Sequence, residues 1–141
     1  MAATFNKFQD FAEQLGKGLH HLHAAGDTLK VFLTNEAPLA TDTVKTDMAE
    51  ISGGGATGYT AGGQDAQNDL SESGGTATLT CVDIVWTAGS SGMGPFRYAV
   101  LYNDTNASDA LVAWWDYESS ISLGEGETFT VNFGASVLTI A

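Results

Sequence analysis

The sequence predicts a mainly β domain, a jelly roll or β-sandwich of about eight short strands with one N-terminal amphipathic helix. Three observations predict it. Residues 95–117 form two alternating apolar runs around a polar turn. Further short β-branched or aromatic runs are separated by Gly-rich turns, and apolar residues near the N-terminus recur at helical spacing. At 141 residues, we expect a single domain, 1–141, with a helical arm at 1–26 and the β-sandwich at 27–141.

The N-terminal arm is predicted to be a helix with Thr4 as its N-cap. Gly16 and Gly18 each weaken such a helix by about 1 kcal/mol relative to alanine, so it needs a surface to pack on. That surface is either the sheet of the same domain or a partner protein. The residues at spacings of three and four are Phe5, Phe8, Ala12, Leu15, Leu19 and Leu22.

The next segments predict one strand followed by loops. Residues 29–35 alternate as a strand, 36–42 carry Pro38 and turn-forming residues, and 43–51 form a short helix or an irregular arm. Residues 53–63 hold six glycines and are expected to be a surface loop that could become ordered only against a partner. Candidate interface residues are therefore Phe5, Phe8, Leu15, Leu19 and Tyr59.

The C-terminal half reads as strands and tight turns. Residues 64–72 suggest a polar edge strand, and 76–87 a β-branched strand whose alternation breaks near Val82, as at a bulge or bend. After the hairpin, short strands are expected at 119–123, 128–133 and 137–140.

The hairpin at 95–117 is the predicted centre of the sheet, with large side chains on both faces. Phe96, Tyr98, Val100 and Tyr102 are expected on one face of the first strand. On the second, Leu111, Ala113, Trp115 and Tyr117 oppose Val112, Trp114 and Asp116. Two packed layers bury both faces. The candidate core residues are Phe96, Tyr98, Val100, Trp115, Phe129, Val131 and Phe133.

The charge distribution excludes some partners. The formal net charge is −12, and residues 46–141 contain Arg97 against twelve acidic residues, whereas residues 1–45 have four lysines and five acidic residues. Such a surface repels nucleic acid and anionic membranes. We see no signal peptide and no apolar run near the ~20 residues of a membrane span. Cys81, alone and in an apolar run, is expected to be a buried thiol.

Candidate chemical motifs are weak. Gly53, Gly55 and Gly58 match a dinucleotide-binding spacing, but no strand precedes them and no helix can follow. His20 and His23 could share a helix face as a metal pair, although histidines near a helix C-terminus need no metal. An EF-hand is rejected, because Trp115 stands where that loop needs its bidentate Glu.

Two acidic pairs, Asp116 with Glu118 and Glu125 with Glu127, have the residue types of a glycosidase site but are expected to be solvated strand-end acids. The tryptophans at 86, 114 and 115 could stack on a sugar, or fill a core. We therefore predict no enzyme, with no catalytic, cofactor-binding or metal-ligating residues.

Several stretches resemble a family of small proteins from tailed-bacteriophage structural gene clusters, and in size and pattern the chain is similar to the jelly-roll cement (decoration) proteins of short-tailed phage heads. The resemblance rests on residues 3–8, 29–35, 58–63, 96–105, 115–117 and 126–131, including FRYAVLYNDT and GETFTV.

The resemblance implies a function without chemistry. Cement proteins bind the outer surface of the head, pair across its two-fold axes and clamp neighbouring major capsid subunits. The expected partners are thus the major capsid protein and a second copy, as a homodimer; the expected location is the capsid exterior of the virion after synthesis in the host cytoplasm. The alternative is a glycan-binding β-sandwich of a head or tail fibre. We expect residues 1–63 to meet the shell or the second copy.

Overall fold

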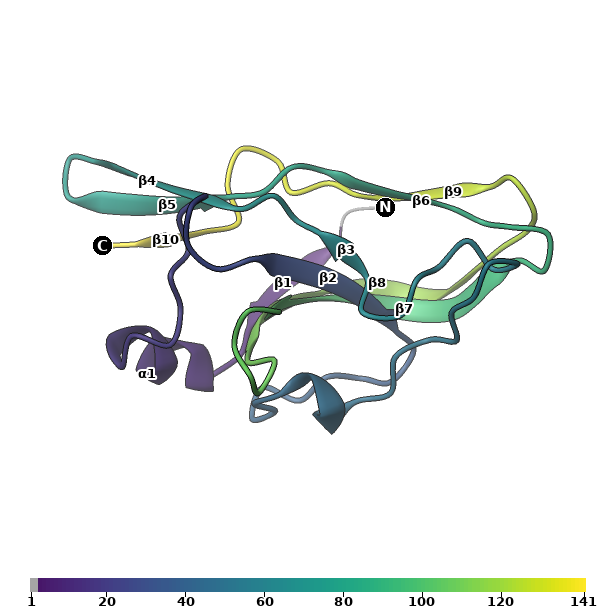
Figure 1. Cartoon of the computed structure of the whole chain (residues 1–141), viewed down its shortest axis with the longest axis horizontal. Helices are drawn as coiled ribbons and strands as arrows, with labels where there is room; N and C mark the ends of the chain where they lie inside the picture. The colour runs from purple at the N-terminus through teal and green to yellow at the C-terminus, as the bar shows by residue number, and fades with distance from the viewer. Residues whose placement is uncertain (1–2) are drawn as a thin grey trace.

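A computed structural model describes residues 3–141, which form two layers of antiparallel strands and one α-helix (Figure 1). The mainly β fold predicted from the sequence is confirmed, with ten strands among the described residues. The elements are β1 (Thr4–Lys7), α1 (Asp10–Gly16), β2 (Leu29–Thr34), the 3-10 helix η1 (Lys45–Asp47), β3 (Gln64–Asp65), β4 (Asp69–Ser73), β5 (Thr76–Thr80), β6 (Ile84–Thr87), β7 (Met93–Asn103), β8 (Leu111–Leu123), β9 (Thr128–Val131) and β10 (Leu138–Ile140).

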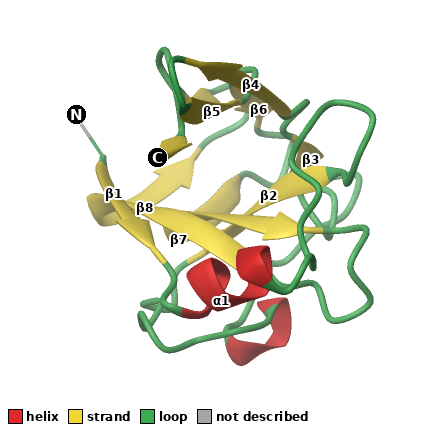
Figure 2. Ribbon diagram, turned by 90° about the vertical axis from the view of Figure 1, so that its left-hand side faces the viewer, coloured by secondary structure: helices red, strands yellow, loops and turns green. Residues whose placement is uncertain are grey.

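The larger layer is a five-stranded sheet in the order β1-β8-β7-β2-β3. The smaller layer consists of a three-stranded sheet, β10-β5-β4, and a two-stranded sheet, β6-β9 (Figure 1). Figure 2 shows the two layers from the side. The run 76–87 supplies both small sheets, because the chain leaves β5 after Thr80 and re-enters as β6 at Ile84. The predicted break near Val82 is therefore confirmed, and it moves the chain from one sheet to the next.

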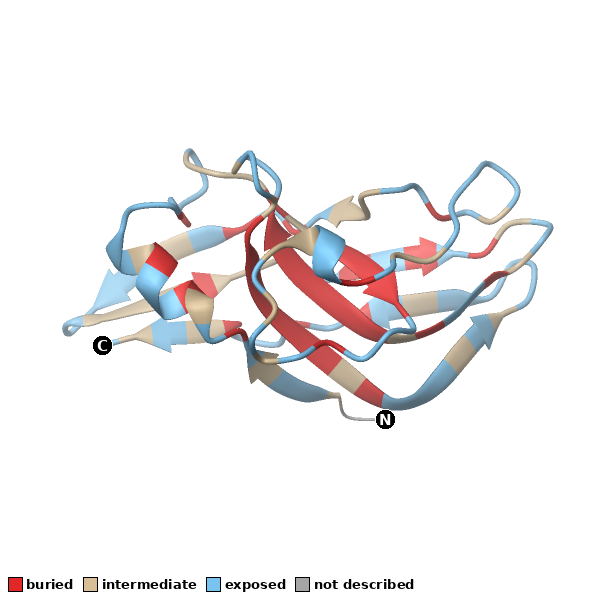
Figure 3. Ribbon diagram, turned by 90° about the horizontal axis from the view of Figure 1, so that it is seen from below, coloured by how far each residue is buried: buried red, intermediate tan, exposed pale blue. Residues whose placement is uncertain are grey.

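Two hydrophobic clusters cover the two faces of the β7–β8 hairpin. The cluster between the layers includes Phe96, Leu101, Trp115 and Val131. On the opposite face, a second cluster is closed over by Phe8, Met48 and Ala40. Figure 3 shows this face, with buried strands in the middle and η1 crossing them.

The predicted division of hairpin residues between the faces is wrong at both ends of the hairpin. Phe96 faces the smaller layer, whereas Tyr98, Val100 and Tyr102 belong to the outer cluster. The β7–β8 register is irregular between these residues: Phe96 pairs with Ile121 but Tyr98 pairs with Asp116, and β7 does not keep its alternation from Phe96 to Tyr98. A second shift between Leu101 and Tyr102 inserts Val112, which places Leu111 on the outer face and Val112 between the layers. Bulges reverse the alternation on which the prediction depended.

The predicted helix with Thr4 as N-cap is also wrong. Thr4–Lys7 is strand β1, which pairs antiparallel with β8, and the helix runs only from Asp10 to Gly16. Gly18, at φ +75°, follows the end of the helix, and the chain to Thr28 is irregular. The segment 1–26 is thus no separate helical arm, because β1 completes the large sheet and Phe11 and Leu22 lie in the interlayer core. No helix within residues 3–141 is long and apolar enough to cross a membrane.

Candidate interaction surface

The five predicted interface residues do not share one exposed face. Phe5 and Leu19 are 40% and 41% exposed, and Leu15 is half-buried. Phe8 is completely buried against Trp114, with ring centroids 4.5 Å apart. Tyr59 is also buried. The prediction is therefore wrong for Phe8 and Tyr59, which hold the fold together and are closed to a partner.

Tyr59 anchors the Gly-rich loop to the large sheet. Its hydroxyl donates to Glu50 Oε1 at 2.6 Å and accepts the backbone N–H of Leu33 at 3.1 Å. Burial, together with the neighbouring Glu50 carboxylate, raises the pKa of Tyr59 far above its ordinary value. The same Glu50 oxygen accepts the N–H of Gly62 at 2.6 Å, and its other oxygen pairs with Lys45 Nζ. The loop is held by its own chain and needs no partner to become ordered.

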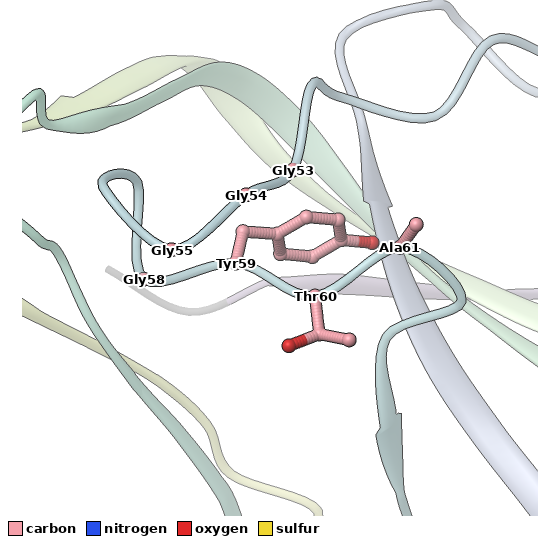
Figure 4. A pocket seen from close by; sticks show the side chains of 7 residues that line it. All are labelled: Gly53, Gly54, Gly55, Gly58, Tyr59, Thr60 and Ala61. Atoms are coloured by element: carbon pink, nitrogen blue, oxygen red, sulfur yellow. The ribbon is translucent and has the colours of Figure 1, made fainter.

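The loop surrounds a hollow of about 620 Å³ lined by residues between 53 and 61 (Figure 4). The lining consists of four glycines with Tyr59, Thr60 and Ala61, and the phenol of Tyr59 crosses it with its hydroxyl turned toward Ala61. None of these lining side chains is ionisable near neutral pH. The hollow has shape but no group suited to acid–base or metal chemistry.

The histidines do not form the metal pair that the sequence left open. His20 is buried, with Nε2 2.9 Å from Gln14 Oε1 and Nδ1 3.0 Å from Asn103 Nδ2. Asn103 Nδ2 can only donate, so Nδ1 accepts and Nε2–H donates to Gln14. His20 is thereby a neutral imidazole with both nitrogens engaged, whereas His23 is exposed. Among residues 3–141, no three metal-ligating side chains are grouped to hold an ion.

We expect the free energy of unfolding to fall as the pH is lowered from 7 to 5, because of His20. Burial lowers the pKa of His20 in the folded protein, whereas the unfolded chain has a pKa of about 6.5. The unfolded state therefore takes up the proton first on acidification. The contribution of His20 is fully present above about pH 6.5 and is lost as the pH falls through the folded-state pKa. Urea titrations at several pH values measure this.

The matched control for this pH dependence is the exposed His23. A His20→Gln variant should show a flatter dependence of unfolding free energy on pH between 7 and 5. A His23→Gln variant should keep the slope of the unmodified protein. Equal slopes in all three proteins would contradict the assignment to His20.

The carboxylate pair at Asp116 and Glu118 is part of a structural contact. Arg97 donates from Nε to Asp116 Oδ1 at 2.8 Å and from Nη2 to Oδ2 at 3.0 Å. This two-pronged contact lowers the pKa of Asp116, and Asp116 Oδ1 also accepts the N–H of Glu118. A general acid needs a raised pKa, so Asp116 is unsuited to that role.

The three tryptophans are buried, with exposures of 1% for Trp86, 9% for Trp114 and 7% for Trp115. Trp86 lies between Tyr59 and Phe129, at centroid distances of 6.3 and 6.2 Å. Trp115 contacts Phe5 and Phe133 edge-on. A sugar-stacking site needs an open indole face, and these rings are covered by protein.

Large apolar side chains are also exposed at positions outside the predicted set. Besides Phe5 and Leu19, they are Leu39, Val82 and Val85, at 62%, 52% and 51% exposure. Phe5, Leu19 and Leu39 belong to the near-neutral residues 1–45. The loop carrying Leu39 adjoins α1, because Gln9 N–H donates to the carbonyl of Ala40 at 2.9 Å. Leu39 was missed; the only signal was a leucine within a predicted loop.

No protein-family model, curated protein or solved structure matches the chain.

Proposed function

We propose that the protein is a structural component of a phage virion. It binds the outer surface of the head and, as a pair of copies, cements neighbouring major capsid subunits. The observation that carries the proposal is the concentration of exposed apolar side chains, Phe5, Leu19 and Leu39, in the near-neutral third of an otherwise strongly acidic chain. Exposed apolar groups in a segment of nearly balanced charge are suited to protein contact, whereas a strongly acidic remainder favours solvent.

The energetics suit a cement. Burying one leucine side chain contributes about 1.5–3 kcal/mol, so a contact built on Leu19 and Leu39 is modest in a single copy. When one body contacts two subunits of a closed shell, the second contact forms at a high effective concentration. Modest contacts then hold the joints between subunits, and many copies share the load.

The ionisable side chains that could take part in catalysis are engaged in hydrogen bonds that hold the fold together, which supports a role without catalysis. His20 joins Gln14 on α1 to Asn103 at the end of β7. Glu50 fixes the Gly-rich loop, and the Arg97–Asp116 contact links β7 to β8. A rigid body transmits force between the subunits that it bridges, as a cement requires.

The glycan-binding alternative is not favoured by the described surface. It depended on an open indole at Trp86, Trp114 or Trp115, and all three are at least nine-tenths buried. We therefore retain the head-binding role as the proposal.

A paired substitution on the proposed contact surface tests the role. A Leu19→Glu, Leu39→Glu double variant should lose at least about tenfold in affinity for phage heads, because each carboxylate replaces apolar area and must be desolvated on contact. Co-sedimentation with heads stripped of this protein measures the loss. Val85→Glu is the matched control, since Val85 is similarly exposed but lies on β6. Equal losses in both proteins, or none in the double variant, would reject the proposed surface.

Deletion of residues 1–24 would not be an informative test of this role. The deletion removes β1 from the large sheet and Phe8, Phe11 and Leu22 from the hydrophobic clusters. Lost binding would then follow from a damaged fold. Surface substitutions avoid this problem.

A further inference from the structure

Strand β1 forms one edge of the five-stranded sheet. It pairs with β8 along Thr4–Lys7, and no described element pairs with its other side. Figure 2 shows β1 at the margin of the molecule with no strand beyond it. The opposite edge differs: β3 has two residues, and the side chain of Gln64 there donates to the carbonyl of Val85.

The ladder to β8 determines which backbone groups of β1 point outward. Phe8 N–H donates to the carbonyl of Val112, which lies opposite it when the β1–β8 register is continued by one residue. Hydrogen-bonded and non-hydrogen-bonded pairs alternate in antiparallel ladders, so Asn6 and Thr4 also direct their backbone groups to β8. The backbone groups of Phe5 and Lys7 then point away from the sheet. This edge contains no proline, and its single charge is at Lys7, so little prevents another strand from pairing there.

We propose that β1 pairs antiparallel with β1 of a second copy, with Phe5 directly opposite Phe5 of that copy. The inference deepens the proposed structural role, which needs a pair of copies, and rests on it for its meaning in the virion. A two-fold axis perpendicular to the sheet keeps each face on its own side, so opposite residues must have the same parity. Pairing Phe5 with itself satisfies this condition and sets Thr4 opposite Asn6.

The side chains favour a second copy as the occupant. Phe5 is 40% exposed, and its ring meets Trp115 edge-on at 5.6 Å, with Trp115 in turn meeting Phe133 at 5.3 Å. In the proposed register, the two Phe5 rings face each other on one side of the sheet and join the two aromatic rows into one. Opposed aromatic pairs stabilise antiparallel strands.

The charges agree with this register. Thr4–Lys7 contains no acidic residue, so two strongly acidic bodies can meet here without opposing carboxylates on the paired strands. Lys7 of the second copy lies opposite Ala3, and Ala3 lies beside Tyr117 if the β1–β8 register is continued by one residue. Lys7 is therefore set opposite an uncharged residue and not opposite Lys7 of the other copy. The contact is short compared with the area that a stable dimer buries, so the pair is weak in solution and gains strength on a shell that holds both copies.

Disulfide trapping tests both the pairing and its register. In the proposed pair the two residues at position 5 have Cα atoms about 5.5 Å apart, within the range of a disulfide. The two residues at position 7 are four residues out of register, roughly 13 Å apart at about 3.3 Å per residue. Purified Phe5→Cys should form a covalent dimer under mild oxidation at least tenfold faster than the control Lys7→Cys. Cys81 is half-buried, and burial raises the pKa of its thiol to about 12, which slows its oxidation. Equal rates, faster trapping at position 7, or no dimer at position 5 would overturn the proposal.

Sedimentation of proteins without new cysteines provides a second readout. The unmodified protein should show concentration-dependent dimerisation, and Phe5→Glu should remain monomeric with an unchanged circular dichroism spectrum. Dimerisation of Phe5→Glu at the level of the unmodified protein would also overturn the pairing. Both measurements use isolated protein, so failure of the pairing is distinguishable from failure of head binding, which the Leu19 and Leu39 variants report.

Discussion

Replacing Gly63 with alanine is expected to lower the free energy of unfolding by about 4 kcal/mol, near the upper end for a single substitution. Gly63 has φ +80°, a backbone conformation that costs a residue with a Cβ about 1–3 kcal/mol. The added Cβ would also collide with the carbonyl oxygen of Val31. Val31 is in the middle of the sheet, paired with Gln64 on one side and Leu101 on the other, so its backbone cannot move aside. Urea denaturation measures the loss.

Gly16→Ala is the matched control for this substitution. Gly16 ends α1, and a Cβ there would meet no atom within 4 Å. The control should leave stability unchanged or raise it by up to about 1 kcal/mol, since alanine is the better helix former. A Gly63→Ala protein as stable as the unmodified one would mean that the close approach of the Gly-rich loop to β2 is wrong.

The Gly-rich loop shows where sequence reasoning reached its limit. Six glycines in 53–63 predict a loop correctly, but they also suggest freedom that the loop does not have. At positions 58 and 63 only glycine fits, because the backbones of Thr87 and Val31 pass where a Cβ would lie. A glycine that gives freedom and one that permits close packing look the same in a sequence.

The positions of the strands could be predicted where apolar and polar residues alternate along a short stretch of sequence. The hairpin of β7 and β8 was placed correctly, because aromatic and β-branched residues alternate around a polar turn. Which face each residue takes depends on bulges, and nothing in the sequence marks the insertion at Val112. Glu118 has φ +70°, a conformation that its residue type does not suggest. Face assignments therefore failed beyond each bulge, including that of Phe96.

The N-terminal segment failed for a related reason. Phe5 and Phe8 fit the helical spacing of the later leucines, yet they pack against Trp115 and Trp114 on opposite faces of the sheet, as the ends of an edge strand can. Pairing with β8 at the edge of the sheet outweighed the local helical periodicity of six apolar positions. For the candidate surface, residue type and sequence spacing could not show that Tyr59 is buried and Leu39 exposed. Burial depends on partners elsewhere in the chain, such as Glu50, which accepts the hydrogen bond of the Tyr59 hydroxyl.

Trp86 is expected to stabilise the fold through the packing of its ring and not through its indole N–H. Trp86→Ala should lower the free energy of unfolding by about 4 kcal/mol, because it leaves a cavity between Tyr59 and Phe129 at the centre of the interlayer core. Its Nε1–H is buried without a hydrogen-bond partner among the described residues. Trp86→Phe therefore loses some packing but removes an unsatisfied donor, and we expect a net cost of about 1 kcal/mol. Thermal and urea unfolding of the two variants measure the difference. If Trp86→Phe were as damaging as Trp86→Ala, the indole N–H would have to be bonded, for which an ordered water between the layers is the available means.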